Sequence, residues 1–179
     1  MSARPIHLLG SPVLREPAVE VKGVDAEVRT LVEDLLDTMR ADKGVGLAAN
    51  QVGVARRVAV VDTNDGEPPV VLINPVILER KGKAVQEEGC LSIPEIYGNV
   101  ERALQIVVET TGLDGKRVRV EAEELRARAI QHEIDHLDGI LFIDRLSPLK
   151  RKLLVNKWNR LRKGKTGFLK EVPAAAAET

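Results

Sequence analysis

The sequence is poor in several features that would place it in a common class of protein. Aromatic side chains make up only 2 % of its 179 residues, so aliphatic residues must fill the core. Lys and Arg number 27, as do Asp and Glu, and this balance excludes a generally basic nucleic-acid binder and an acidic disordered chain. No apolar run approaches the ~18 residues that cross a bilayer, and no signal peptide is visible. We expect a cytoplasmic protein without membrane or DNA contacts.

Cysteine is nearly absent as well. The single residue, Cys90, cannot form an internal disulfide. It is therefore a buried small side chain, a reactive thiol or a metal ligand.

The length suits one domain, and its patterns predict an α+β fold. Apolar residues at helical spacing predict helices over 25–40, 122–137 and 147–162. Short β-branched runs predict strands at 57–61, 70–73, 76–78, 104–110 and 118–121, with an Asp-Gly hairpin between the last two. Such short connections favour antiparallel pairing. We expect one domain over residues 1–164 and a flexible tail over 165–179.

The predicted middle helix contains the motif H-E-x-x-H. His132 and His136 stand one turn apart on the same face, so both imidazoles can reach one ion. Glu133 follows the first ligand and can reach a water that the metal holds. Two chance histidines would be the bland alternative, but the chain has only three in all. The motif favours a metal-binding helix at the centre of the antiparallel strands.

A hydrolytic site of this kind needs three protein ligands and one open position. The third ligand must come from elsewhere in the chain. Cys90, His7 and a carboxylate are the candidates, and a thiolate is a strong ligand.

Three segments together resemble the peptide deformylase family. They are Gly44-Val45-Gly46-Leu47-Ala48-Ala49-Asn50-Gln51, Glu88-Gly89-Cys90-Leu91-Ser92 and Gln131-His132-Glu133-Ile134-Asp135-His136-Leu137. Their order and separations also match, and flanking stretches at 72–75 and 139–150 extend the resemblance over most of the chain. It implies an enzyme that removes the formyl group from the formyl-methionine of newly made proteins, in bacteria or organelles descended from them.

The resemblance also implies a metal site. Its ligands would be Cys90, His132 and His136, with water in the fourth position. The ion in this family is typically ferrous iron, with zinc, nickel or cobalt as alternatives, and a Cys-His-His set suits several divalent ions.

Catalytic and binding roles follow from the same resemblance. Glu133 would act as general base and then acid, while the Gln51 amide and the Leu91 backbone N–H donate to the developing oxyanion. The nascent peptide would pair with residues 44–46 and 89–91. The implied substrate-binding residues are Val45, Gly46, Gly89, Leu125 and Ala129.

A few charged and polar residues near the motif bear on the shape of the substrate pocket. Gln86 and Arg128 stand where some family members carry aliphatic residues. We expect at least one of Arg126 and Arg128 to lie on the solvated side of the helix. Asp135 is expected to pair with Arg102 and so brace the ligand-bearing helix.

The predicted C-terminal helix is basic. Eight Lys and Arg residues lie between positions 147 and 167, and no acidic residue offsets them. These residues are explained most simply as a solvated helix face without a binding role. The resemblance implies docking on the ribosome near the exit tunnel, where phosphates attract basic side chains.

Two other functions stay open at this level. H-E-x-x-H also marks metalloproteases, although their third ligand is usually a downstream His or Glu and no His follows His136. The other alternative is a structural metal site in a non-catalytic, ribosome-associated binding module. A closed site would need a fourth ligand, which His7 would have to supply.

Overall fold

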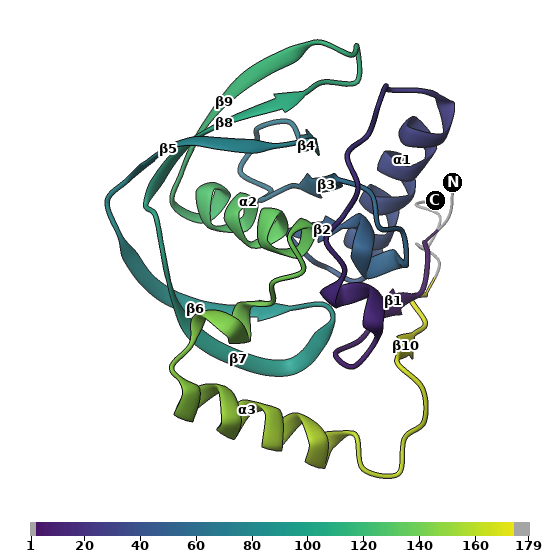
Figure 1. The fold of residues 1–179 in the computed structure, drawn as a ribbon, viewed down its shortest axis with the longest axis vertical. Helices are drawn as coiled ribbons and strands as arrows, with labels where there is room; N and C mark the ends of the chain where they lie inside the picture. The colour runs from purple at the N-terminus through teal and green to yellow at the C-terminus, as the bar shows by residue number, and fades with distance from the viewer. Residues whose placement is uncertain (1–2, 174–179) are drawn as a thin grey trace.

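The computed structural model describes residues 3–173 and has the predicted α+β architecture (Figure 1). Its helices are α1 (Ala26–Ala41), α2 (Glu124–Leu137) and α3 (Pro148–Leu161), with short 3-10 helices at Pro12–Arg15, Ala49–Val52 and Phe142–Arg145. Its strands are β1 (Ile6–His7), β2 (Gly46–Ala48), β3 (Val58–Val61), β4 (Val70–Ile73), β5 (Val76–Lys81), β6 (Ala84–Cys90), β7 (Ile93–Arg102), β8 (Gln105–Thr111), β9 (Arg117–Glu123) and β10 (Leu169–Lys170).

These strands pair antiparallel throughout, as the short connections predict. They form a β2-β3-β4 sheet, a β5-β8-β9 sheet, a long β6-β7 hairpin and a small β1-β10 pair. The Asp-Gly signal is confirmed as the turn between β8 and β9, where Gly112 N donates to Lys116 O at 2.8 Å. Gly115 takes a φ of +82° there, which suits glycine.

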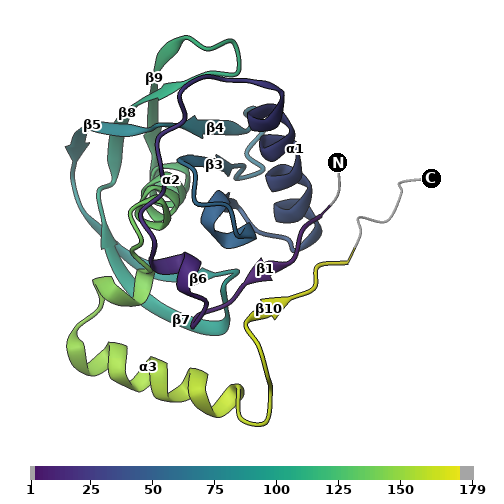
Figure 2. The same cartoon turned by 45° about the vertical axis from the view of Figure 1, so that its right-hand side comes forward.

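Helix α2 lies at the centre of the molecule, as predicted. Figures 1 and 2 show the two three-stranded sheets and the β6-β7 hairpin arranged around it. Its apolar side chains, such as Ile130 and Leu137, are fully buried in one cluster with Val108 of β8 and Ala59 of β3. This burial holds the helix rigidly in place and thereby positions the motif.

The helix boundaries agree closely with the predicted ones. The Asp25 side chain accepts from Val28 N at 2.9 Å and begins α1, and Ser147 begins α3 with Pro148 in the first position. Helix α2 begins two residues later than predicted, because Glu123 still pairs with Gln105 in the sheet. No helix within residues 3–173 is long and apolar enough to cross a membrane.

The β6-β7 hairpin is the main element that the sequence patterns miss. In β6 three consecutive polar residues, Gln86, Glu87 and Glu88, interrupt any apolar alternation, and β7 contains Pro94 and Gly98. Neither segment therefore shows a clear strand pattern in the sequence. The short strand β10 is also unexpected. It lies within the segment expected to be a tail, and residues 174–179 of that segment lie outside the described part of the chain.

Candidate metal centre

The structure brings a sulfur and two imidazoles together from two separate elements. His132 and His136 project from α2, while Cys90 is the last residue of β6. Their ligand atoms all lie within 4.8 Å of one another. His136 Nε2 is 3.2 Å from His132 Nε2 and 3.3 Å from Cys90 Sγ.

These separations fit a divalent ion. Ligands at the usual metal–nitrogen and metal–sulfur bond lengths of a tetrahedral site lie ~3.4 Å apart, close to the observed values. Burial lowers the pKa of His136 well below its ordinary value, which favours the neutral imidazole that a metal requires. His7, the candidate fourth ligand of a closed site, does not belong to this group and instead lies 2.7 Å from Ser11 through Nδ1.

Glu88 orients the first histidine. Its Oε1 lies 2.9 Å from His132 Nδ1, so the Nδ1–H donates to this carboxylate and the opposite nitrogen, Nε2, faces His136. Burial alone would raise the pKa of Glu88, but hydrogen bonds from Arg102 and His132 outweigh it and hold that pKa well below its usual range. In the sequence, Glu88 stands out only as part of the segment Glu88-Gly89-Cys90-Leu91-Ser92. Its position two residues before Cys90 is the feature of the sequence that could have predicted its place beside the ligands.

Glu133 is buried beside the ligands. Its Oε2 has no hydrogen-bond partner within the described part of the chain. Burial raises the pKa of its carboxyl to about 7, against the attraction of His132. Gly46 lies so close that a Cβ atom there would come 2.6 Å from Glu133 Oε1.

Gln51 is held next to the sulfur. Its Oε1 accepts from Ala48 N at 2.9 Å, and its Nε2 donates to Ser92 Oγ at 3.0 Å and to Cys90 Sγ at 3.6 Å. The amide is therefore fixed with its donor end beside Cys90. Leu91 lies in the tight turn that joins β6 to β7.

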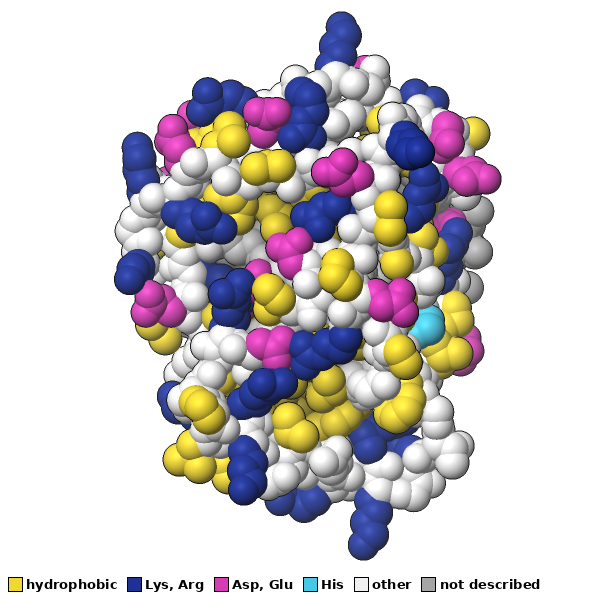
Figure 3. All heavy atoms as spheres, viewed as in Figure 1, with side chains coloured by type: hydrophobic (Ala, Val, Ile, Leu, Met, Phe, Trp, Pro, Cys, Tyr) yellow, Lys and Arg dark blue, Asp and Glu magenta, His cyan; other side chains and the backbone are white. Residues whose placement is uncertain are grey.

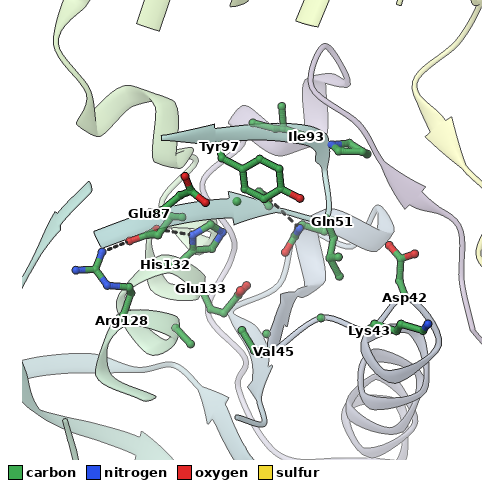
Figure 4. A pocket seen from close by; sticks show the side chains of 18 of the residues that line it. Asp42, Lys43, Val45, Gln51, Glu87, Ile93, Tyr97, Arg128, His132 and Glu133 are labelled. Carbon is green, nitrogen blue, oxygen red and sulfur yellow. Dashed lines mark hydrogen bonds and ion pairs between the residues drawn. The ribbon is translucent and has the colours of Figure 1, made fainter. Parts of the chain in front are cut away.

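A cavity of about 500 Å³ opens in front of this group (Figure 4). All five residues expected to bind substrate line it: Val45, Gly46, Gly89, Leu125 and Ala129. Gln51, Cys90, Leu91, His132 and Glu133 line it too. Gln86 does not, because it is exposed on β6. The cavity is also lined by Tyr97, Asp42 and Lys170, which no sequence motif predicts.

Charged side chains behind the ligands are tightly paired. Arg102 Nη1 lies 2.5 Å from Asp135 Oδ2, so the expected pairing of these residues is confirmed. Arg145 binds the other oxygen of Asp135 at 2.7 Å. At least one of Arg126 and Arg128 is expected on the solvated side of the helix. Arg128 is buried, so the expected solvated position does not apply to it. Arg126 lies nearer the surface and pairs with Asp65 at 2.7 Å.

The fold and the site together define a class of protein. A three-ligand group that opens onto a cavity, with an unpartnered buried carboxylate beside it, is the arrangement of a mononuclear metallohydrolase.

Comparison with known proteins narrows the class to a family. Residues 3–152 match the family model of polypeptide deformylase. A peptide deformylase of Acidobacterium capsulatum is 45 % identical over 166 residues, which cover 91 % of this chain and 98 % of that protein. A peptide deformylase of Agrobacterium fabrum is 47 % identical and covers 92 % and 99 %. The crystal structure of a peptide deformylase from Legionella pneumophila superposes with a TM-score of 0.83 at 41 % identity, covering 92 % of this chain and 99 % of that one.

The chain belongs to the polypeptide deformylase family. It is accordingly a metal-dependent hydrolase that removes the N-terminal formyl group from nascent proteins. This assignment decides against both the metalloprotease and the non-catalytic binding module.

Proposed function

We propose that Cys90, His132 and His136 hold one ferrous ion at which this chain releases formate from formyl-methionine. The convergence of their ligand atoms within 4.8 Å is the observation that carries the proposal. A bound divalent ion supplies Lewis acidity and activates a water near neutral pH. Zinc, nickel and cobalt suit the same donors, and the resemblance favours iron.

Glu133 is the proton carrier in this proposal. Its Oε2 is buried without a partner among the described residues, and its side chain faces the cavity (Figure 4). It accepts the proton of the attacking water and later delivers it to the leaving amine. The same carboxylate does not join the ligand group, so it stays free for this transfer.

Gln51 stabilises the charge that develops on the formyl oxygen. The Ala48 N–H fixes the orientation of the Gln51 amide, so Nε2 points to the ligand side of the cavity. The backbone N–H of Leu91, next to Cys90, is the second donor. Removal of one such donor typically costs ~10²–10³ in rate.

Substrate binding divides into a pocket and a backbone track. Val45, Leu125 and Ala129 line the cavity with apolar surface suited to a methionine side chain. Gly46 and Gly89 lie in strands β2 and β6 that can pair with an extended peptide through main-chain hydrogen bonds, which read no sequence.

Anaerobic purification followed by metal analysis and a formate-release assay tests the proposal. We expect about one iron per chain and turnover of a formyl-Met peptide with its peptide bonds intact. Glu133→Gln should retain the metal and lose at least ~10²-fold in kcat. A Glu133→Gln variant with normal kcat would contradict the assigned role, and a purified chain without metal would contradict the ligand set.

We further propose that α3 docks on the ribosome in the cytoplasm. Lys150, Lys152 and Lys157 are exposed on α3. In Figure 3 the Lys and Arg side chains at the lower end of the molecule have no Asp or Glu side chain among them on the face shown. Ribosomal RNA phosphates attract such a surface.

Replacing these three lysines by glutamine should weaken co-sedimentation with ribosomes at low salt. The matched control replaces Lys22, Lys81 and Lys116, which are also exposed and lie outside α3. Equal binding by both triple variants would contradict docking through α3.

A further inference from the structure

The proposed metal ligands lie on two separate elements of the fold. His132 and His136 are on α2, whereas Cys90 is on the β6-β7 hairpin. That hairpin forms its own two-stranded sheet and shares no strand with the others. A site built across such a junction needs contacts that fix the hairpin to the helix.

We propose that Arg128 is a positioning residue that fixes the hairpin to α2 and thereby sets the place of Cys90 relative to the two histidines. The inference rests on the ligand set proposed above. Arg128 lies on α2 one turn before His132, and its side chain is only 7 % exposed.

Arg128 contacts both strands of the hairpin. Its Nη1 donates to Val100 O of β7 at 2.8 Å, and its Nη2 donates to Ala84 O of β6 at 2.7 Å. Nη1 also reaches Glu88 Oε2 of β6 at 2.6 Å. One guanidinium from the helix thus binds three acceptors that belong to the element carrying Cys90.

The third contact joins Arg128 to the ligands themselves. Glu88 stands two residues before Cys90, and its other oxygen lies 2.9 Å from His132 Nδ1. Figure 4 shows these bonds running from Arg128 through the carboxylate to His132. Arg128 therefore fixes both the strand that presents the sulfur and the carboxylate that orients one imidazole.

The planar fork of arginine suits this place. It can satisfy a carboxylate and two carbonyls at once, whereas the single ammonium of lysine cannot span them. An aliphatic side chain would leave Ala84 O and Val100 O without this donor. Arg102 makes a different link, since it lies on β7, binds Glu88 through Nε and Nη2, and contacts α2 at Asp135.

The experiment compares Arg128→Met and Arg128→Lys with the wild-type chain. Arg126→Met is the matched control, because Arg126 lies on the same helix but pairs with Asp65. Each chain is loaded with Co²⁺, and three quantities are measured: the rate of metal loss to a chelator, the thiolate-to-cobalt absorption band, and the unfolding temperature of the metal-free protein.

We expect Arg128→Met to lose metal about 10–100-fold faster than wild type, with a weakened or shifted thiolate band. The rate of metal loss from Arg128→Lys should lie between those of Arg128→Met and wild type. Arg126→Met should match wild type in both the rate and the band. These differences should exceed what the unfolding temperatures of the metal-free chains explain, since a purely structural role would lower that temperature and leave metal loss unchanged.

Wild-type metal loss and an unaltered band in Arg128→Met would overturn the proposal. If Arg128→Met does not fold, Arg128→Lys decides, because wild-type behaviour there would show that the forked contacts to both strands are not needed. A wild-type protein without any thiolate band would instead overturn the ligand set, and with it this inference.

Discussion

Gly46 shows how a single residue serves the site in a way that its pattern does not reveal. A glycine-rich loop suggests close approach of the backbone to a substrate. In the structure Gly46 also makes room for Glu133, because a Cβ atom would come 2.6 Å from Oε1. The end of the Glu133 side chain can move aside, so an added methyl group at Gly46 leaves the fold intact. It shifts the Glu133 carboxylate from its place beside the ligands.

Gly46→Ala should therefore fold normally and lose activity. Displacement of Glu133 by about 1 Å is expected to lower kcat on the order of 10²-fold, with a change of less than ~1 kcal/mol in the free energy of unfolding. Steady-state kinetics and urea unfolding measure the two effects. Gly23→Ala is the control, since a Cβ there meets nothing within 4 Å; full activity in Gly46→Ala would contradict the crowding.

At the scale of elements, Asp144 links three segments next to α2. It accepts from Leu141 N at 2.9 Å in the 3-10 helix Phe142–Arg145, and it pairs with Arg15 near the N-terminus and with Arg151 of α3. Burial would raise the pKa of Asp144, but the hydrogen bonds from Arg15 and Leu141 outweigh it and lower that pKa. The ionised carboxylate therefore stabilises the folded protein.

Asp144→Asn should destabilise the protein by about 1 kcal/mol at pH 7. Because the pKa is lowered on folding, the contribution of the carboxylate is complete above its unfolded value near 3.8 and disappears as the pH falls through the folded value. The difference between variant and wild type should thus narrow below about pH 4.

Urea unfolding at pH 7, 5 and 3.5 measures this difference. Asp37→Asn in α1 is the matched control, because it removes a carboxylate outside the Asp144 cluster. A constant difference between Asp144→Asn and wild type across the three pH values would contradict the lowered pKa.

At the scale of the whole molecule, the two ends of the described chain meet. Strand β10 pairs with β1, and Leu8 N donates to Phe168 O at 2.7 Å (Figure 2). Lys170 Nζ binds both oxygens of Asp42 at 2.9 and 2.8 Å, and both residues line the cavity. The expected domain boundary at residue 164 leaves this strand out.

A chain ending at Gly164 tests that boundary. We expect its unfolding temperature to fall by several degrees, as the loss of ~1–2 kcal/mol implies for a protein of this size, and its KM for formyl peptides to rise because the cavity rim is lost. Lys170→Ala should lower the unfolding temperature and raise the KM by smaller amounts. An unaltered unfolding temperature in the truncated chain would mean that residues 1–164 are complete by themselves.

Much of the fold follows from local patterns. Capping by Asp25 and Ser147, the helical spacing of α2 and the Asp-Gly turn involve residues within one turn of each other, so short stretches determine them. The β6-β7 hairpin does not follow in this way. In β6 the buried residue is the charged Glu88, and in β7 Pro94 and Gly98 interrupt the apolar positions Ile93, Ile96 and Val100. The hairpin therefore depends on the pairing of its two strands, which no short stretch of sequence reveals.

The sequence by itself determined the pair of imidazoles, because a spacing of four residues on a helix places both on one face. Helical spacing left Cys90, His7 and a carboxylate open as the third group, and only the tertiary structure brings Cys90, 42 positions before His132 in the chain, close to both imidazoles. The same holds for Arg128, which a helical pattern cannot distinguish from a solvated residue. Its partners are Glu88 and two backbone carbonyls on strands that are distant in the sequence. Arg128 contacts them only because the folded chain brings α2 against the hairpin.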